Sequence, residues 1–220
     1  DVGHEITWDS WGDIGNVDIL YSKTGAPPFV DYVVRDTACD GSYVWNIAVD
    51  DGEGSSDGEI NFEHNADIKF KIITTSGLVE DIADGVITIQ GKLLLSAPSG
   101  QATVLKVYSG VAGDIPTITW NTYGKVPQVD LRYDTGGAGT YNGFIADAVN
   151  NTGSYDLWQV PNIIGDDIKV RVRSTNNPTI IFGDSSQPFK VKGQIKISAP
   201  DSTVAGANAW IVDNSAAGLP

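Results

Sequence analysis

The sequence is poor in the residues that enzymes most often use as nucleophiles, bases and metal ligands. Its 220 residues include one cysteine, two histidines and no methionine. A single cysteine, Cys39, excludes a disulfide within the chain. It precedes the turn signal Asp40-Gly41, and we assign no role to it. His4 and His64 lie in unrelated contexts, and with one cysteine they form neither a zinc-ligand spacing nor a nucleophile–base pair. We therefore expect no enzyme.

Basic residues and long apolar runs are also scarce. Lys and Arg number 14 against 28 Asp and Glu, which gives a formal charge of −14. Binding to phosphate backbones needs clustered cations, so a nucleic-acid partner is excluded. An acidic surface suits divalent cations, high salt or plain solubility. No window approaches 18 uncharged apolar residues, and we expect no direct membrane insertion.

What the sequence does contain is a repeat. The segment from Ile6 to Tyr43 recurs without a gap 112 residues later, so that Trp8 corresponds to Trp120 and Tyr43 to Tyr155. Self-similarity at this period predicts two copies of one unit. Within each copy, short segments alternate apolar and polar residues and are separated by glycine-rich turns, while helical periodicity is nearly absent. The sequence therefore predicts an all-β fold.

A unit of about 110 residues with seven or so short strands is typical of a β-sandwich. We expect one domain over residues 1–110 and a second over residues 111–220, joined by a hinge at residues 109–113. Because residues 200–218 resemble residues 98–113, we interpret the chain as a mature product or a piece of a longer array. Four aromatic residues are the expected core anchors: Trp8, Trp45, Trp120 and Trp158.

The composite of these motifs resembles the Ig-like repeat of the Ser/Thr-rich GPI-anchored membrane family, which occurs in fungal cell-wall proteins and prokaryotic surface proteins. The first copy departs from the pattern, since it has Cys39-Asp40-Gly41 and lacks a Val-Pro and an Asp-Ser-Ser segment. The second copy carries the matching motifs: Ile118-Thr119-Trp120, Val129-Asp130-Leu131-Arg132-Tyr133, Asn151-Thr152-Gly153-Ser154-Tyr155, Trp158-Gln159-Val160-Pro161, Ile168-Lys169-Val170-Arg171-Val172 and Asp184-Ser185-Ser186-Gln187-Pro188-Phe189.

The resemblance implies two tandem immunoglobulin-like β-sandwich domains in an extracellular protein of the cell surface, with no catalytic residues to carry over. We expect a structural protein of a surface layer, filament or cell-wall array that assembles through protein–protein contacts, as a homo-oligomer or lattice. The alternative is an adhesin stalk, or a carbohydrate-binding accessory module of a larger extracellular protein that takes glycans as ligands. Fold analogy alone does not choose between them.

One acidic loop is a candidate calcium site. Hard cations bind several carboxylate and carbonyl oxygens on a flexible loop. Residues 50–59 supply such oxygens, although the spacing is not that of an EF-hand, because Phe62 follows Asp51 by eleven residues. The alternative is a solvated loop without metal, so the cofactor is either none or Ca²⁺. The candidate ligands are Asp50, Asp51, Glu53, Asp57 and Glu59.

Two further surface features point outward from the expected turns. Asn150-Asn151-Thr152 is an N-glycosylation sequon, with Asn150 as the acceptor. Trp11 and Tyr123 occupy equivalent positions in the two copies, where each could stack on a sugar, fill a pocket of a neighbouring molecule or close the end of its own sandwich.

Overall fold

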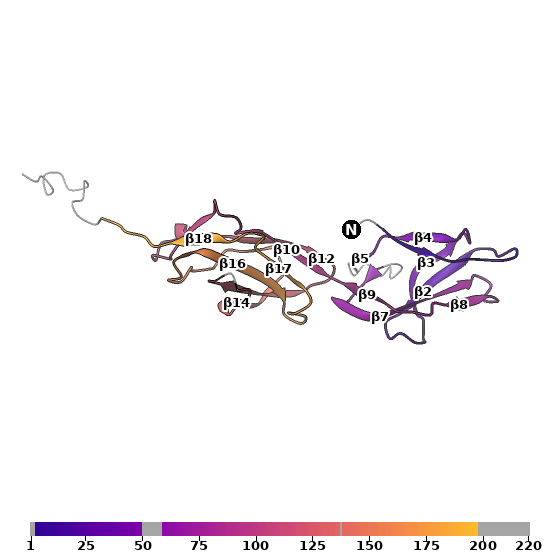
Figure 1. Ribbon diagram of the computed structural model, residues 1–220. Coiled ribbons are helices and arrows are strands. Elements are labelled where there is room, and N and C mark those ends of the chain that lie inside the picture. The colour runs from indigo at the N-terminus through magenta and orange to yellow at the C-terminus, as the bar shows by residue number, and fades with distance from the viewer. Residues whose placement is uncertain (1–2, 50–58, 137, 198–220) are drawn as a thin grey trace, which may run out of the picture.

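The computed structural model describes residues 3–49, 59–136 and 138–197, and this part of the chain is all-β. Apart from a short 3₁₀ turn, η1 (Ala112–Asp114), its regular elements are strands, mostly paired antiparallel. Figure 1 shows the strands in two groups that lie end to end in an elongated molecule. We refer to residues 3–90 as the N-terminal half and to residues 92–197 as the C-terminal half. The all-β fold predicted from the alternating pattern is confirmed.

The N-terminal half contains one large sheet and two short pairs. The large sheet has the order β3-β2-β7-β8, with β9 also paired to β7, and the pairs are β1-β4 and β5-β6. These strands are β1 (His4–Thr7), β2 (Val17–Ser22), β3 (Asp31–Thr37), β4 (Ser42–Trp45), β5 (Ala48–Val49), β6 (Glu59–Ile60), β7 (His64–Thr74), β8 (Glu80–Ile82) and β9 (Ile87–Gln90).

The C-terminal half has a similar plan and also contains nine strands among its described residues. Its large sheet has the order β11-β18-β16-β13-β14, with β17 also paired to β16, and its small sheet has the order β10-β12-β15. The strands are β10 (Lys92–Ala97), β11 (Val104–Lys106), β12 (Ile118–Tyr123), β13 (Gln128–Asp134), β14 (Gly143–Asn150), β15 (Ser154–Tyr155), β16 (Gly165–Ser174), β17 (Phe182–Asp184) and β18 (Phe189–Lys192).

The strand registers repeat as the sequence does. In β1 and β4 Ile6 lies opposite Tyr43, and 112 residues later Ile118 lies opposite Tyr155 in β12 and β15. The β2–β3 and β13–β14 pairs also correspond, and both contain register shifts at equivalent places. A one-residue slip would turn every apolar side chain to the wrong face, so shared registers require a shared pattern. The repeat in the sequence is therefore accompanied by a repeat of strand pairing.

Each half has its own apolar core. The N-terminal core is built around Ile19, Tyr21 and Trp45, and the C-terminal core around Trp120 and Trp158. These three tryptophans are at most 3% exposed, as predicted for core anchors. The fourth expected anchor, Trp8, is only partly buried at the edge of its core.

The sheets change membership at Gly91. The strand before it, β9, pairs with β7, whereas the strand after it, β10, pairs with β12. The predicted division at residues 110 and 111 places β10 and β11 in the first unit, although Leu93 and Leu95 of β10 are buried in the core of the second. Sequence similarity marks where a repeat recurs, while hydrogen bonding marks where a sheet ends, and here the two differ.

Candidate functional site

The two halves meet at a buried carboxylate. Glu63 precedes β7 in the N-terminal half and is 8% exposed. Its side chain accepts hydrogen bonds from the Ser174 hydroxyl at 2.6 Å and from the Asn176 and Asn177 amides at 3.0 and 2.8 Å. These donors lie at the end of β16 and in the turn that follows it. Burying a carboxylate is costly unless donors satisfy it, so Glu63 ties the two halves together through three charge-assisted bonds.

Two glycines allow close backbone approach at the same place. The Gly91 N–H donates to the Glu63 carbonyl at 2.8 Å. A Cβ on Gly91 would lie 3.0 Å from the Tyr123 carbonyl oxygen, and one on Gly124, whose φ is +79°, would lie 3.0 Å from the Gly91 Cα. Larger side chains would push the halves apart. The junction is thus a close-packed contact fixed by hydrogen bonds.

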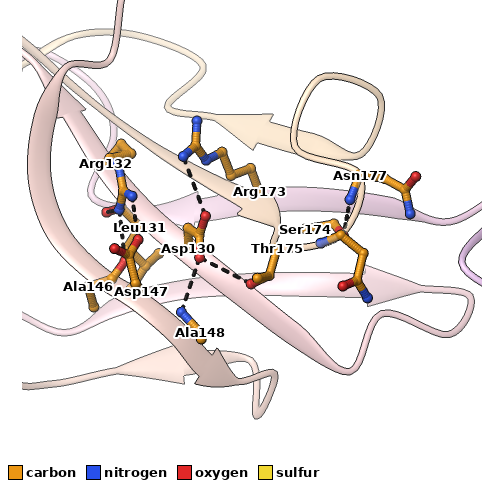
Figure 2. Close-up of polar contacts among 11 residues, drawn as sticks. Asp130, Leu131, Arg132, Ala146, Asp147, Ala148, Arg173, Ser174, Thr175 and Asn177 are labelled. Atoms are coloured by element: carbon orange, nitrogen blue, oxygen red, sulfur yellow. Dashed lines mark hydrogen bonds and ion pairs between the residues drawn. The ribbon is translucent and has the colours of Figure 1, made fainter.

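A second polar cluster organises the sheet of the C-terminal half (Figure 2). Asp130 on β13 accepts hydrogen bonds from the Ala148 N–H at 3.0 Å and the Thr175 hydroxyl at 3.1 Å, and Arg173 contacts its other oxygen at 3.4 Å. Ala148 has a φ of +49°, which an alanine rarely adopts. Asp130 therefore holds a strained bulge of β14 in place.

The N-terminal half uses the same device. Asp18, which corresponds to Asp130, accepts the Asp36 N–H at 2.8 Å, and Asp36 has a φ of +52°. In both copies, a carboxylate accepts a hydrogen bond from the backbone of a β-bulge. This role is structural, because a bulge sets the bend of its strand. This explains why the Val-Asp-hydrophobic pattern recurs in the sequence.

On β16, Arg171 is held by both ionic and aromatic contacts. Its guanidinium forms a bidentate pair with Asp184 at 2.6 and 2.8 Å and lies 4.0 Å from the Tyr141 ring centre and 4.1 Å from that of Phe182. Hydrogen bonding to Asp184 raises the pKa of Arg171, while burial, followed by the Asp184 charge, raises the pKa of Tyr141 above its ordinary value. These contacts satisfy the charges of Arg171 and Asp184 and hold β17 against β16.

An open groove lies beside the β1-β4 pair of the N-terminal half. It has a volume of about 590 Å³ and runs between residues 6–11 on one side and β7 with β8 on the other. Phe70 and Ile72 of β7 are part of its lining, together with Trp8 and Trp11. A second hollow of about 770 Å³ lies between β1 and β9, and its lining also includes Phe70 and Tyr123. Both hollows expose the side of a core.

The same core positions are closed in the C-terminal half. Four residues beside the hollows are only partly buried, namely Ile6, Trp8, Phe70 and Ile72. Their equivalents, at most 3% exposed, are Ile118, Trp120, Val170 and Val172. The residue types are similar, so the difference lies in what covers them. β10 and β11 pair alongside these positions in the C-terminal half, and the N-terminal half has no equivalent strands among its described residues.

Most of the expected calcium ligands belong to residues 50–58. Asp50, Asp51, Glu53 and Asp57 lie outside the described residues, and Glu59 begins β6. Across residues 3–49, 59–136 and 138–197, no group of three or more His, Cys, Asp or Glu side chains is arranged to hold a metal ion. Ca²⁺ binding by the acidic loop stays a prediction.

The sequon lies at the end of β14, and its first residue is accessible. Asn150 is exposed. Its neighbour Asn151 is engaged, since its oxygen accepts the Trp120 indole N–H at 2.6 Å and its amide donates to the Val126 carbonyl at 2.6 Å. The equivalent of Asn151 in the first copy is Cys39, whose sulfur accepts the Trp8 indole N–H at 3.4 Å. Cys39 thus has a structural role that the sequence analysis missed.

The matched loop aromatics are both accessible. Trp11 is 83% exposed and Tyr123 is 47% exposed. Tyr123 ends β12 opposite Lys92 of β10, whereas Trp11 lies beyond the end of β1 on the rim of the open groove. With that exposure, Trp11 does not close the end of its own half.

The chain matches no model of a known protein family, no curated protein and no solved structure in these three comparisons. The described residues include no helix with the length and apolar character needed to cross a membrane.

Proposed function

We propose that the chain is a structural protein of the cell surface, in which two immunoglobulin-like β-sandwich repeats act as rigid modules of a surface layer, filament or cell-wall array. The observation that carries this proposal is the junction. Glu63 joins two separately cored halves end to end through three hydrogen bonds, and Gly91 and Gly124 let the backbones of the two halves pack closely beside it. A rigid elongated unit is what a load-bearing array needs.

Two other features support an extracellular scaffold. The formal charge of −14 keeps a repeated, exposed surface soluble. The polar clusters around Asp130 and Arg171 hold strands together, as expected of a building block. The resemblance of the second copy to Ig-like surface repeats points the same way, and assembly would occur with copies of the same chain.

Electron microscopy and sedimentation of the purified chain test the proposal. We expect particles that lengthen with protein concentration, because an array grows through contacts between copies. The measurement is repeated with Ca²⁺ and with a chelator, since the acidic loop predicts that calcium strengthens assembly and raises the melting temperature. A chain that stays monomeric at every concentration, with and without Ca²⁺, would refute the assembly function.

A carbohydrate-binding module is the second candidate, and one observation favours it. Trp11 is 83% exposed at the rim of a groove, beside the polar residues Asp9 and Ser10. An exposed aromatic next to a carboxylate suits a sugar ring. A glycan array, in which immobilised sugars are probed with the purified chain, tests this function. Saturable binding to one glycan class that is lost in the Trp11→Ala variant would support it over the first.

A further inference from the structure

β10 completes the C-terminal half from outside its repeat. It runs antiparallel to β12, with Leu93 opposite Thr122 and Leu95 opposite Trp120. Leu93 is 1% exposed and Leu95 is 9% exposed, and both belong to the C-terminal core. A Cβ on Gly183 of β17 would lie 2.5 Å from the Leu93 carbonyl oxygen, so β10 is seated closely over that strand.

A second copy of the β10 sequence occurs after β18. Residues 91–97 read Gly-Lys-Leu-Leu-Leu-Ser-Ala, and residues 193–199 read Gly-Gln-Ile-Lys-Ile-Ser-Ala. Ile195 and Ile197 stand at the places of the two buried leucines, yet they are 99% and 78% exposed. The side chains that fill a core in one copy are therefore displayed to solvent in the other, which is costly for two isoleucines.

The matching acceptor is the edge of the N-terminal half. β10 pairs with residues 119–123, and the equivalent residues are 7–11. Among the described residues, no strand pairs with residues 8–11, and β1 ends at Thr7. The groove of about 590 Å³ lies alongside this segment, over the partly buried Trp8. An unpaired edge beside an open apolar groove is the arrangement that β-strand addition uses.

We propose that residues 194–197 of one copy of this chain insert as a strand into the groove of the N-terminal half of a second copy. The inference rests on the proposed assembly function and names its contact. Transferring the β10–β12 register places Ile197 opposite Trp8 and Ile195 opposite Ser10. The two isoleucines then face the groove, as Leu95 and Leu93 face the C-terminal core.

Charge supports the same register. It places Lys196 opposite Asp9, where the second copy of the repeat has the uncharged pair Leu94 and Asn121. Opposite charges in a cross-strand pair stabilise an antiparallel register. The pair therefore favours this segment of a second copy over an unrelated apolar strand.

The contact is head to tail. In Figure 1 the chain leaves the C-terminal half at the end remote from the junction, whereas the acceptor edge belongs to the other half. A single molecule thus carries a donor and an acceptor on different halves. Such a heterologous contact does not close on itself in a pair and continues as a filament.

One feature of the groove differs from its closed counterpart. Asp81 of β8 stands opposite Ile72 where Gly183 of β17 stands opposite Val172. The inserted strand therefore contacts the Asp81 side chain, whereas β10 contacts a glycine at the equivalent place. As a result, the inserted strand lies farther from β8 than β10 lies from β17. This makes the contact between copies weaker than the one within the chain.

The first test removes the apolar donor side chains from the full chain. Ile195→Ser with Ile197→Ser should raise the dissociation constant of assembly about a hundredfold or more, measured by sedimentation, because two buried isoleucines are lost. The control is Leu157→Ser with Val30→Ser, which removes two apolar side chains that are 67% and 66% exposed and lie outside the donor segment and the groove lining. The control should assemble as the original chain does, and all variants should melt alike when dilute.

The second test exchanges the charges. Asp9→Lys or Lys196→Asp alone should weaken assembly about tenfold, because each creates a like-charge pair, and the two together should restore it. Assembly that survives the isoleucine substitutions, or a double exchange that fails to restore it, overturns this contact and leaves the proposed function standing. A chain that is monomeric at every concentration overturns both.

Discussion

At the scale of single residues, Glu63 has the most influence on how the molecule is built. Its three donors come from one turn of the other half, and the Ser174 oxygen also accepts the N–H groups of Asn176 and Asn177 at 3.1 and 3.0 Å. Every polar group of this small network therefore depends on the others. A neutral replacement would leave at least one donor facing another donor in a buried place.

We expect Glu63→Gln to lower the free energy of unfolding by about 1.5–3 kcal/mol, the usual range for hydrogen bonds to a charged group. Chemical denaturation measures the loss, and solution scattering should show a wider range of angles between the halves. Glu5→Gln is the matched control, because Glu5 is exposed on β1. Equal stability of the two variants would mean that the junction does not depend on this carboxylate.

At the scale of elements, β10 shows how a strand can belong to one repeat in sequence and to the next in structure. Its leucines alternate inward and outward as its pattern predicts, and its neighbour in the small sheet is β12. Its partner surface is shaped for it, since Gly183 leaves room for the β10 backbone. In the C-terminal half, β10 fits the surface formed by β12 and β17. The N-terminal half has a similar surface, the acceptor groove, but carries Asp81 at the position of Gly183.

Gly183→Ala should therefore destabilise the C-terminal half by about 1–3 kcal/mol, the cost of forcing extra volume into a packed site. Thermal melting measures this loss. Gly113→Ala serves as the control, because a Cβ there meets nothing within 4 Å and its φ is not in the left-handed region. If Gly183→Ala melts as the original chain does, β10 is not seated as closely as the structure places it.

The same reasoning gives an opposite expectation for the open groove. Asp81→Gly should strengthen assembly of the full chain, since it removes the side chain that an inserted strand would meet. Sedimentation gives the dissociation constant, and Asp84→Gly is a nearby control on an exposed residue outside the groove lining. Equal or weaker assembly of Asp81→Gly would contradict the seating inferred for the donor.

At the scale of the whole molecule, the two cores are separate and unequally covered. Ile118, Trp120, Val170 and Val172 are closed off from solvent, whereas their counterparts in the N-terminal half remain partly exposed. A core that leaves apolar surface in water gains less free energy from burial. The two halves should therefore differ in stability, although they share a strand plan.

Calorimetry should resolve two unfolding transitions, with the N-terminal half melting first. Ile19→Ala and Leu131→Ala are matched probes, because they are equivalent residues with 0% exposure, and each should cost about 2–5 kcal/mol. Ile19→Ala should lower the midpoint temperature of the first transition only, and Leu131→Ala that of the second transition only. One transition that shifts with either substitution would show that the halves unfold as a unit.

The sequence predicted the local structure well, for reasons that lie within short segments. Alternating apolar residues and glycine-rich turns predicted the all-β fold. The recurrence of residues 6–43 after 112 residues is matched by the recurring register of β1 and β12. The acidic calcium loop and the family resemblance stay predictions. The sequence did not indicate the role of Cys39, because its Trp8 partner lies 31 residues away in the chain.

By itself, the sequence determined that the chain is β-structured and that one pattern occurs twice, because these depend on period, composition and self-similarity. Only the tertiary structure decided which half each strand completes. Hydrogen-bond partners and burial depend on contacts between distant segments. The tertiary structure alone therefore revealed that β10 closes the second core, that Glu63 joins the halves, and that the first core is open beside an edge left unpaired by the described residues.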